Sequence, residues 1–136
     1  MRFMLLLCSF LVLQAAPALA QHTLPACDGT IAIVRVSDIK PGAMKDFLAA
    51  VEAHKAWYRK NGVTDNDILV SRVIVKDEKT GGWKYSDSQV ITYHTNPPEA
   101  NEKLPRNDAD WNAYVKMYND SSTVKSISLS CMPKIK

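Results

Sequence analysis

Two histidines are the side chains of this chain best suited to moving a proton. His54 recurs at helical spacing with Phe47 and Tyr58, and His94 follows Tyr93 at the end of a strand-like run. An imidazole gains or loses its proton close to neutral pH, so either ring could act as a general base. The alternatives are a partly buried His54 that hydrogen-bonds a carbonyl or a water, and an exposed His94 at an ordinary strand end. We therefore predict His54 and His94 as candidate catalytic residues, set against these structural roles.

Five further polar side chains lie on strand-like segments: Arg35, Arg72, Asp87, Gln89 and Tyr93. Arginine binds carboxylates through paired hydrogen bonds, and donors of this kind can also polarise a carbonyl group. If the five share one face of a sheet, they form a ligand-binding set. The alternative is an arginine–aspartate network that fixes the packing of two subunits.

Residues 1–20 are typical of a cleavable secretory signal peptide. Arg2 precedes the apolar run Phe3–Leu13, and Ala18-Leu19-Ala20 places small residues before a cleavage point at Gln21. The alternative is an uncleaved anchor, but the apolar run is shorter than the roughly 20 residues that span a bilayer. We expect a secreted or periplasmic protein with no membrane span after cleavage of the signal peptide.

Cys27 and Cys131 are the two cysteines that follow the signal segment. In an oxidising compartment such a pair favours a disulfide, and no CxxC spacing supports a redox or metal-binding pair. A second alternative is lipidation, because Leu24-Pro25-Ala26-Cys27 loosely resembles a lipobox. The disulfide is the preferred prediction.

Periodicity and turn residues divide the rest of the chain into six elements, which we expect to form a single domain over residues 21–136. Asp77–Gly82 suits a hairpin turn, Asn61-Gly62 suits a helix end, and Asp108 suits a helix N-cap. The helices begin at residues 43 and 109, and the strands cover residues 30–37, 68–76, 83–95 and 126–132.

The order β-α-β-β-α-β is that of the ferredoxin-like α+β fold, which has four antiparallel strands and both helices on one face. In this topology the first and last strands are neighbours. Cys27, which lies just before the first strand, therefore comes close to Cys131 near the end of the last strand. The fold prediction and the disulfide prediction support each other.

Alternation along each strand predicts which side chains face the helices. The opposite face then carries Arg35, Arg72, Asp87, Gln89 and Tyr93 among apolar residues, and we expect a second subunit or a ligand to cover it. The side chains predicted to face the helices are Ala32, Val34 and Val36; Leu69, Val73 and Val75; Val90 and Thr92; and Ile127, Leu129 and Cys131.

The element order in a chain of this size, with Asp108–Tyr114 (DADWNAY) opening the second helix after a long loop, resembles the dimeric α+β barrel superfamily. The resemblance implies a homodimer in which two ferredoxin-like subunits pack their open sheet faces together. Relatives include cofactor-free monooxygenases, haem-degrading enzymes, lactone isomerases and proteins with no known activity. No short family motif is matched, so the resemblance assigns no catalytic residue.

Composition and missing motifs exclude several functions. The chain has 17 basic and 14 acidic side chains, and Arg2 is the one charged residue of the signal segment, so the exported part has a net charge of +2 and no nucleic-acid partner is expected. Phosphate-loop glycines, GxSxG and HExxH are absent, and we expect neither a cofactor nor a metal. We expect an exported small-molecule-binding protein. The alternatives are a cofactor-independent monooxygenase or isomerase acting on a small aromatic or carbonyl compound, and a structural interaction module of the cell envelope.

Overall fold

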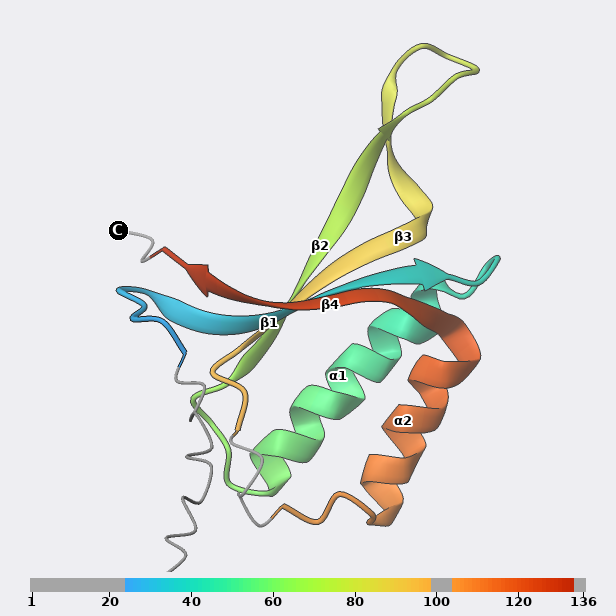
Figure 1. The fold of residues 1–136 in the computed structure, drawn as a ribbon. Helices are drawn as coiled ribbons and strands as arrows, with labels where there is room; N and C mark the ends of the chain where they lie inside the picture. The colour runs from blue at the N-terminus through green and yellow to red at the C-terminus, as the bar shows by residue number, and fades with distance from the viewer. Residues whose placement is uncertain (1–23, 99–103, 134–136) are drawn as a thin grey trace, which may run out of the picture.

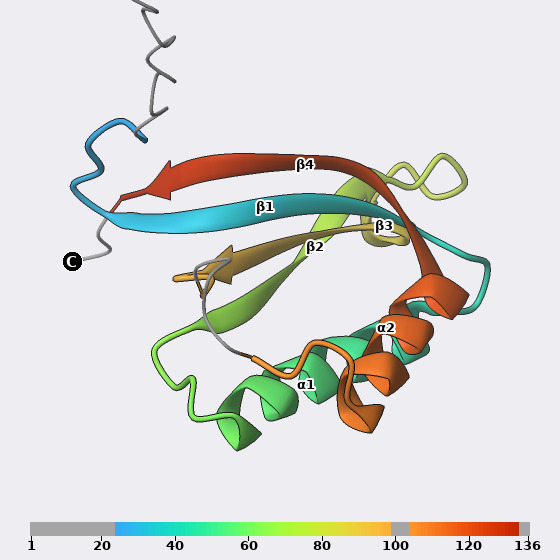
Figure 2. The ribbon, with the colours of Figure 1, turned by 60° about the horizontal axis from the view of Figure 1, so that its bottom comes forward.

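A computed structural model describes residues 24–98 and 104–133, and the predicted signal segment lies outside these ranges. Four antiparallel strands form one sheet in the order β2-β3-β1-β4, and both helices cover the same face of it (Figures 1 and 2). The predicted ferredoxin-like α+β fold is confirmed. In chain order the elements are β1 (Thr30–Ile39), α1 (Met44–Lys60), β2 (Asp67–Lys76), β3 (Trp83–Thr95), α2 (Ala109–Ser121) and β4 (Ser122–Met132).

The helices end and begin largely where the sequence predicts. The Asp108 carboxylate accepts a hydrogen bond of 2.7 Å from the Trp111 N–H, which is the predicted N-cap of α2. It also accepts hydrogen bonds from the indole of Trp57 on α1, so one side chain starts α2 and ties the two helices together. After α1, Gly62 has a φ of +81°, a left-handed conformation that glycine adopts without strain.

The largest difference from the predicted boundaries is at β4, which begins at residue 122 rather than 126 and follows α2 with no loop between them; β1 also extends to Ile39 rather than to residue 37. The Ser121 hydroxyl donates to the carbonyl of Met117 at 2.7 Å, and the Ser122 hydroxyl donates to that of Tyr118 at 3.0 Å. These two hydroxyls satisfy carbonyls of the last helical turn. The chain can therefore leave the helix directly into an extended strand.

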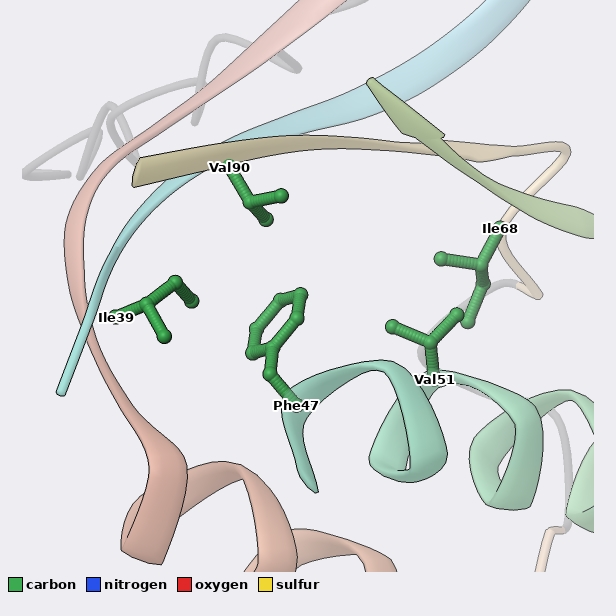
Figure 3. Packing of buried hydrophobic residues seen from close by; sticks show 5 residues of the cluster. All are labelled: Ile39, Phe47, Val51, Ile68 and Val90. Atoms are coloured by element: carbon green, nitrogen blue, oxygen red, sulfur yellow. The ribbon is translucent and has the colours of Figure 1, made fainter. Parts of the chain in front are cut away.

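The packed core lies between the sheet and α1. Phe47 and Val51 of α1 meet Ile39, Ile68 and Val90 of the sheet (Figure 3), and all five are buried. A second cluster joins the two helices through Trp57, Tyr58 and Tyr114. The helices thus pack on each other through aromatic rings, and the sheet receives its packing mainly from α1.

The predicted orientation of β1 and β2 is wrong, whereas that of β3 and β4 holds. Ile39 and Ile68 lie in the core, so the alternate residues of β1 and β2, including Arg35, point to the helices. Val90 and Thr92 of β3 face the helices as predicted, since Val90 is in the core and Thr92 pairs with Arg35. Both phases of β1 are rich in isoleucine and valine, so hydrophobic alternation does not decide between them.

A disulfide joins Cys27 and Cys131, whose Cα atoms are 5.7 Å apart. It links the segment before β1 to the end of β4, as the strand order predicts. With its sulfur in this bond, Cys27 has none left for lipidation, so that alternative does not fit the structure. No helix within the described ranges is long and apolar enough to cross a membrane.

The β2–β3 hairpin extends well beyond the rest of the sheet (Figure 1). The regular pairing shifts between Arg72 and Ile74, and beyond this irregularity Ile74 pairs with Tyr85 and Lys76 with Trp83. A turn closed by the Asp77 N–H and the Gly82 carbonyl, 2.7 Å apart, connects the strands, which confirms the predicted hairpin. We call residues 74–85 the arm. It rises on the side of the sheet away from the helices.

Candidate functional site

A cavity of about 530 Å³ lies between the sheet and the helices. The aromatic side chains of α2 pack mainly against α1. The helices therefore leave an unfilled space over the half of the sheet formed by β1 and β4. The wall includes Ile33, Arg35 and Ser37 of β1, Phe47 and His54 of α1, Ile68 of β2, Thr92 and His94 of β3, Trp111, Tyr114, Val115, Tyr118 and Asn119 of α2, and Ser122, Thr123 and Val124 of β4.

Arg35 supplies the permanent positive charge of this cavity. It sits on β1, one of the two inner strands of the sheet, and pairs with Thr92 on one side and Ile127 on the other. Its Nε is buried and has no hydrogen-bond partner among the described residues. No aspartate or glutamate belongs to the described cavity wall. The guanidinium therefore faces a space in which the described residues offer no counter-ion.

His54 lies within a stack of aromatic rings. Its ring centroid is 4.3 Å from that of Tyr114, with the planes 12° apart, and 4.8 Å from that of Tyr58. Burial, followed by the charges of His94 and Arg35, lowers the pKa of His54 from 6.5 to about 3. The ring is consequently neutral at physiological pH. Its Nε2 is buried without a partner among the described residues.

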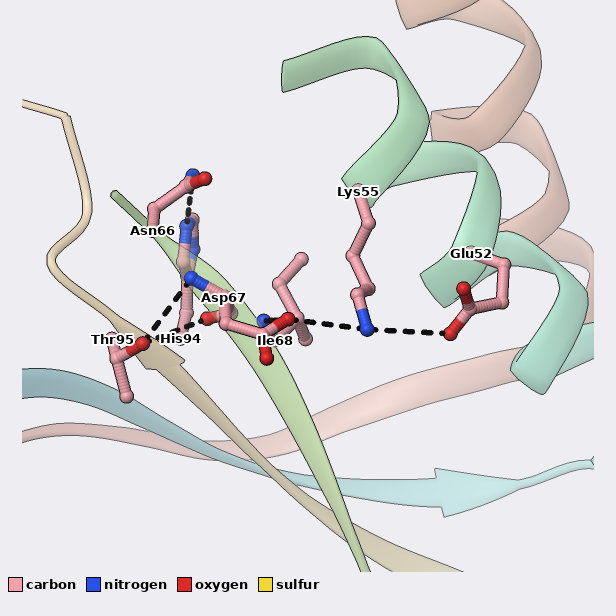
Figure 4. Close-up of polar contacts among 7 residues, drawn as sticks. All are labelled: Glu52, Lys55, Asn66, Asp67, Ile68, His94 and Thr95. Atoms are coloured by element: carbon pink, nitrogen blue, oxygen red, sulfur yellow. Dashed lines mark hydrogen bonds and ion pairs between the residues drawn. The ribbon is translucent and has the colours of Figure 1, made fainter. Parts of the chain in front are cut away.

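His94 lies beside His54 in the cavity wall, with the ring centroids 5.6 Å apart. Its Nε2 lies 3.3 Å from the side-chain nitrogen of Asn66 (Figure 4). Burial and the charge of Arg35 lower the pKa of His94 to about 4, although Asp67 acts in the opposite direction.

Two tyrosines of α2 also line the wall. Burial raises the pKa of Tyr114 and of Tyr118 above the ordinary tyrosine range, so both are neutral phenols able to donate a hydrogen bond. The charge of Arg35 acts in the opposite direction on the pKa of Tyr118, but burial outweighs it. The Tyr114 hydroxyl is buried and unpaired among the described residues.

Asp67, which precedes the cross-strand pair of Ile68 and His94, is an acidic side chain that already has a cation. Asp67 lies 3.1 Å from the Lys55 Nζ, which in turn contacts Glu52 at 3.6 Å (Figure 4). Burial raises the pKa of the Asp67 carboxyl, but hydrogen bonds from Lys55 and the Ile68 N–H outweigh this and leave it below its usual value. Asp67 therefore remains an anion, with Lys55 as its cation, outside the cavity wall.

The structure brings together three of the predicted site residues, His54, His94 and Arg35, which all line the cavity. Arg35 had been expected on the opposite sheet face. The error follows from the wrong phase of β1, because a shift of one residue exchanges the two faces of a strand.

The other four predicted site residues lie elsewhere and do not form one site. Arg72 pairs with Val90 on the helix side, donates to the Ser86 carbonyl at 3.2 Å, and is 4.0 Å from Asp87. Gln89 donates to Asp38 at 3.1 Å, and Tyr93 pairs with Val34 on the open face. Among the described residues, the predicted arginine–aspartate contact is made by Arg72 and Asp87.

Tyr114 and Tyr118, which both line the cavity, are not among the site residues predicted from the sequence. Trp111, Tyr114 and Tyr118 follow one another at steps of three and four residues, which does indicate one face of a helix. The spacing does not reveal that part of this helix face borders the cavity. The unpaired Tyr114 hydroxyl is the structural sign of that space.

No family model, curated protein or solved structure matches this chain. Its chemistry must be inferred from the cavity itself. Within the described ranges, no group of three or more histidine, cysteine or acidic side chains is placed to hold a metal ion. The ionisable groups of the described wall are one cation, two neutral imidazoles and two neutral phenols, set among aromatic, aliphatic and small polar side chains. This combination can bind an anion at one end and a flat apolar body along its length.

Proposed function

We propose that this chain is an exported binding protein for a small organic acid with a flat, apolar body. The acid group would lie against Arg35, and the body would lie among the rings of Phe47, Trp111 and Tyr118. The observation that carries the proposal is the buried, unpaired Nε of Arg35 in a cavity whose described wall has no acid.

The energetics favour an anion at this position. A buried polar group without a partner costs free energy, and a hydrogen bond to a charged group contributes roughly 1.5–3 kcal/mol. An arginine can hold both oxygens of a carboxylate at once. The cavity volume of about 530 Å³ also lies within the range of about 300–1,000 Å³ that is usual for small-molecule sites.

The histidines and Tyr114 add selectivity. The Tyr114 hydroxyl can donate to a ligand oxygen, and the Nε2 of His54 can accept from a ligand hydroxyl. Because these groups are buried and unpaired, a ligand that supplies the complementary groups gains more than one that does not.

Catalysis by a cofactor-independent oxygenase or isomerase remains the second candidate, because two unprotonated imidazoles lie beside a cation. A general base works best when its pKa is close to the working pH, and values of about 3 and 4 make His54 and His94 weak bases in the empty cavity. Binding is therefore the better-supported function. Turnover of a bound compound that is lost in His94→Gln while binding persists would favour catalysis. A purely structural module, the third candidate, has no use for an unfilled cavity around an unpaired arginine.

Export and dimerisation belong to the same proposal. Export is supported by the pattern of residues 1–20 and by the Cys27–Cys131 bond, which suits an oxidising compartment. Membership of the dimeric α+β barrel superfamily would pair the open sheet faces of two copies. Support comes from that face, which carries Val34, Val36 and Tyr93 and lacks the two arginines expected there.

The test uses calorimetric titration of the exported protein with benzoate, salicylate and cinnamate, each compared with its neutral amide. We expect the acids to bind and the amides to bind at least tenfold more weakly. Arg35→Met, which keeps the length of the side chain but removes its charge, should lose roughly tenfold to a hundredfold in affinity for the acids. Arg72→Met is the matched control, because Arg72 does not line the cavity. Equal binding of acids and amides, no binding of any acid at millimolar concentration, or wild-type affinity in Arg35→Met would refute the proposal.

A further inference from the structure

Four polar side-chain atoms of the cavity wall are buried and have no hydrogen-bond partner among the described residues. The acid group of the proposed ligand accounts for one of them, the Nε of Arg35. The others are the hydroxyl of Ser37, the Nε2 of His54 and the hydroxyl of Tyr114. A buried polar atom without a partner costs free energy, so each position favours a ligand that supplies one. These atoms therefore indicate where a ligand carries its own polar groups.

The floor of the cavity runs along β1 in a fixed order. Ile33, Arg35 and Ser37 line it at two-residue spacing, so they share one face of the strand. Ile33 pairs with His94, and Ser37 pairs with Val90 of the core. From Ile33 to Ser37 the floor is roughly 13 Å long, at about 3.3 Å per residue. Arg35 therefore lies in the middle of the floor, with Ser37 at one end and His94 at the other.

Rings of the two helices form the other side of the cavity. His54 lies 5.6 Å from His94 between ring centroids and is stacked on Tyr114 at 4.3 Å. Tyr118 follows at 6.0 Å from His54, and Phe47 lies 5.5 Å beyond Tyr118. The unpaired atoms of His54 and Tyr114 thus belong to two stacked rings, which we call the ring pair, at the His94 end of the cavity.

Ser37 adds a second hydrogen-bond donor beside Arg35. Its side chain is buried and lies on the same strand face, roughly 7 Å further along β1. A carboxylate has two oxygens and accepts several hydrogen bonds at once. One acid group can therefore bind the guanidinium of Arg35 and the hydroxyl of Ser37 together. The flat body of the ligand then extends along the floor towards His94, which brings its far end to the ring pair.

We propose that the ligand is a para-hydroxyaryl carboxylate, an aromatic acid whose hydroxyl group lies at the opposite end from the acid group. The acid contacts Arg35 and Ser37, and the hydroxyl lies at the ring pair. The acid at Arg35 is that of the proposed function, on which this inference rests. A ligand hydroxyl can donate to one member of the ring pair and accept from the other. Because the Tyr114 hydroxyl can take either role, this match holds for both tautomers of His54.

Calorimetric titration of the exported protein at pH 7 with matched pairs of acids tests the position of the hydroxyl. The pairs are 4-hydroxybenzoate with 4-methylbenzoate and 4-hydroxycinnamate with 4-methylcinnamate. A methyl group is similar to a hydroxyl in size but forms no hydrogen bond, and the two pairs cover two lengths of ligand. In at least one pair, we expect the hydroxy acid to bind about tenfold or more tightly than the methyl acid.

Variants that remove one unpaired atom at a time assign the contacts. Tyr114→Phe and His54→Phe keep an aromatic ring, so each should bind the methyl acid as wild type does but reduce the preference for the hydroxy acid to about threefold or less. Tyr85→Phe, the same change on the exposed arm, is the control and should keep the full preference. Ser37→Ala should weaken both acids about tenfold, whereas Ser71→Ala, outside the cavity wall, should not. Urea unfolding establishes that each variant is folded.

Three results would overturn the inference: equal affinity for the hydroxy and methyl acids in both pairs, a full preference for the hydroxy acid in Tyr114→Phe or His54→Phe, and wild-type affinity for the acids in Ser37→Ala. The methyl acids separate this failure from a failure of the proposed function. If they bind and lose affinity in Arg35→Met, the acid site stands and only the assignment of the hydroxyl or of Ser37 is wrong. If no acid binds, both proposals are wrong.

Discussion

Mild acid should destabilise this protein chiefly through His54. The ring is stacked between Tyr58 and Tyr114, and burial together with the charges of His94 and Arg35 lowers its pKa to about 3. In the unfolded chain the same ring titrates near 6.5. Between these two values the unfolded state binds more protons than the folded state. The free energy of unfolding therefore falls as the pH falls from about 6.5 towards 3, and the full stability is present above 6.5.

The size of the effect follows from the shift. Each unit of pKa difference corresponds to about 1.36 kcal/mol. A change from pH 8 to pH 5 covers roughly one and a half units of the window, so His54 alone should remove about 2 kcal/mol. His94, with a pKa of about 4, acts in the same direction, but its contribution is smaller because solvent reaches it more easily. Asp67 does not interfere, because its pKa lies below this range.

Urea unfolding followed by circular dichroism at pH 8, 7, 6 and 5, with the disulfide intact, measures this loss. The comparison is His54→Phe, which keeps an aromatic ring between Tyr58 and Tyr114 but cannot take up a proton. The wild type should lose about 2 kcal/mol more than His54→Phe between pH 8 and pH 5. If the two proteins lose the same free energy over this range, His54 is not a buried neutral imidazole and the reasoning about the cavity wall fails.

Two further outcomes are expected. Replacing both Cys27 and Cys131 by serine should lower the free energy of unfolding by at most about 4–5 kcal/mol, because the bond closes a loop between residues 104 apart. Urea unfolding of the double variant measures this loss, and an unchanged free energy of unfolding would contradict the prediction. Binding of an acid beside Arg35 should offset the charge that lowers the pKa of His54 and His94, so the complex should take up protons at pH 5. Titration calorimetry in two buffers of different ionisation enthalpy measures that uptake, and identical heats in both buffers would count against an anion at Arg35.

The fold could be predicted from the sequence because its boundaries are marked by local chemistry. The N-cap at Asp108 depends on residues only a few positions apart, and so does the turn from Asp77 to Gly82. Both features are therefore visible in the sequence. The disulfide followed because strand order alone brings the two chain ends of the domain together.

The site was predicted only in part, since its residues depend on tertiary packing. Arg35 was recognised as a binding group but assigned to the wrong face, because Ile33 and Val34 are equally acceptable inside a sheet. His54 and His94 were recognised separately, but their approach to Arg35 depends on the placement of β1 between β3 and β4. The cavity itself arises because α2 packs on α1, a preference that no local pattern records.

The direct passage from α2 into β4 bears on how fast a ligand can come and go. Tyr118 on the last turns of the helix and Val124 at the start of the strand stand on the same side of the cavity, joined by Ser121 and Ser122 with no loop between them. The two serine hydroxyls fix this junction to the helix carbonyls. On this side a ligand can be admitted only by side-chain rotation, which takes nanoseconds, and not by hinge motion of whole elements, which takes microseconds to milliseconds. Binding of a ligand that enters on this side should therefore show a single fast kinetic phase, whose observed rate rises in proportion to the ligand concentration.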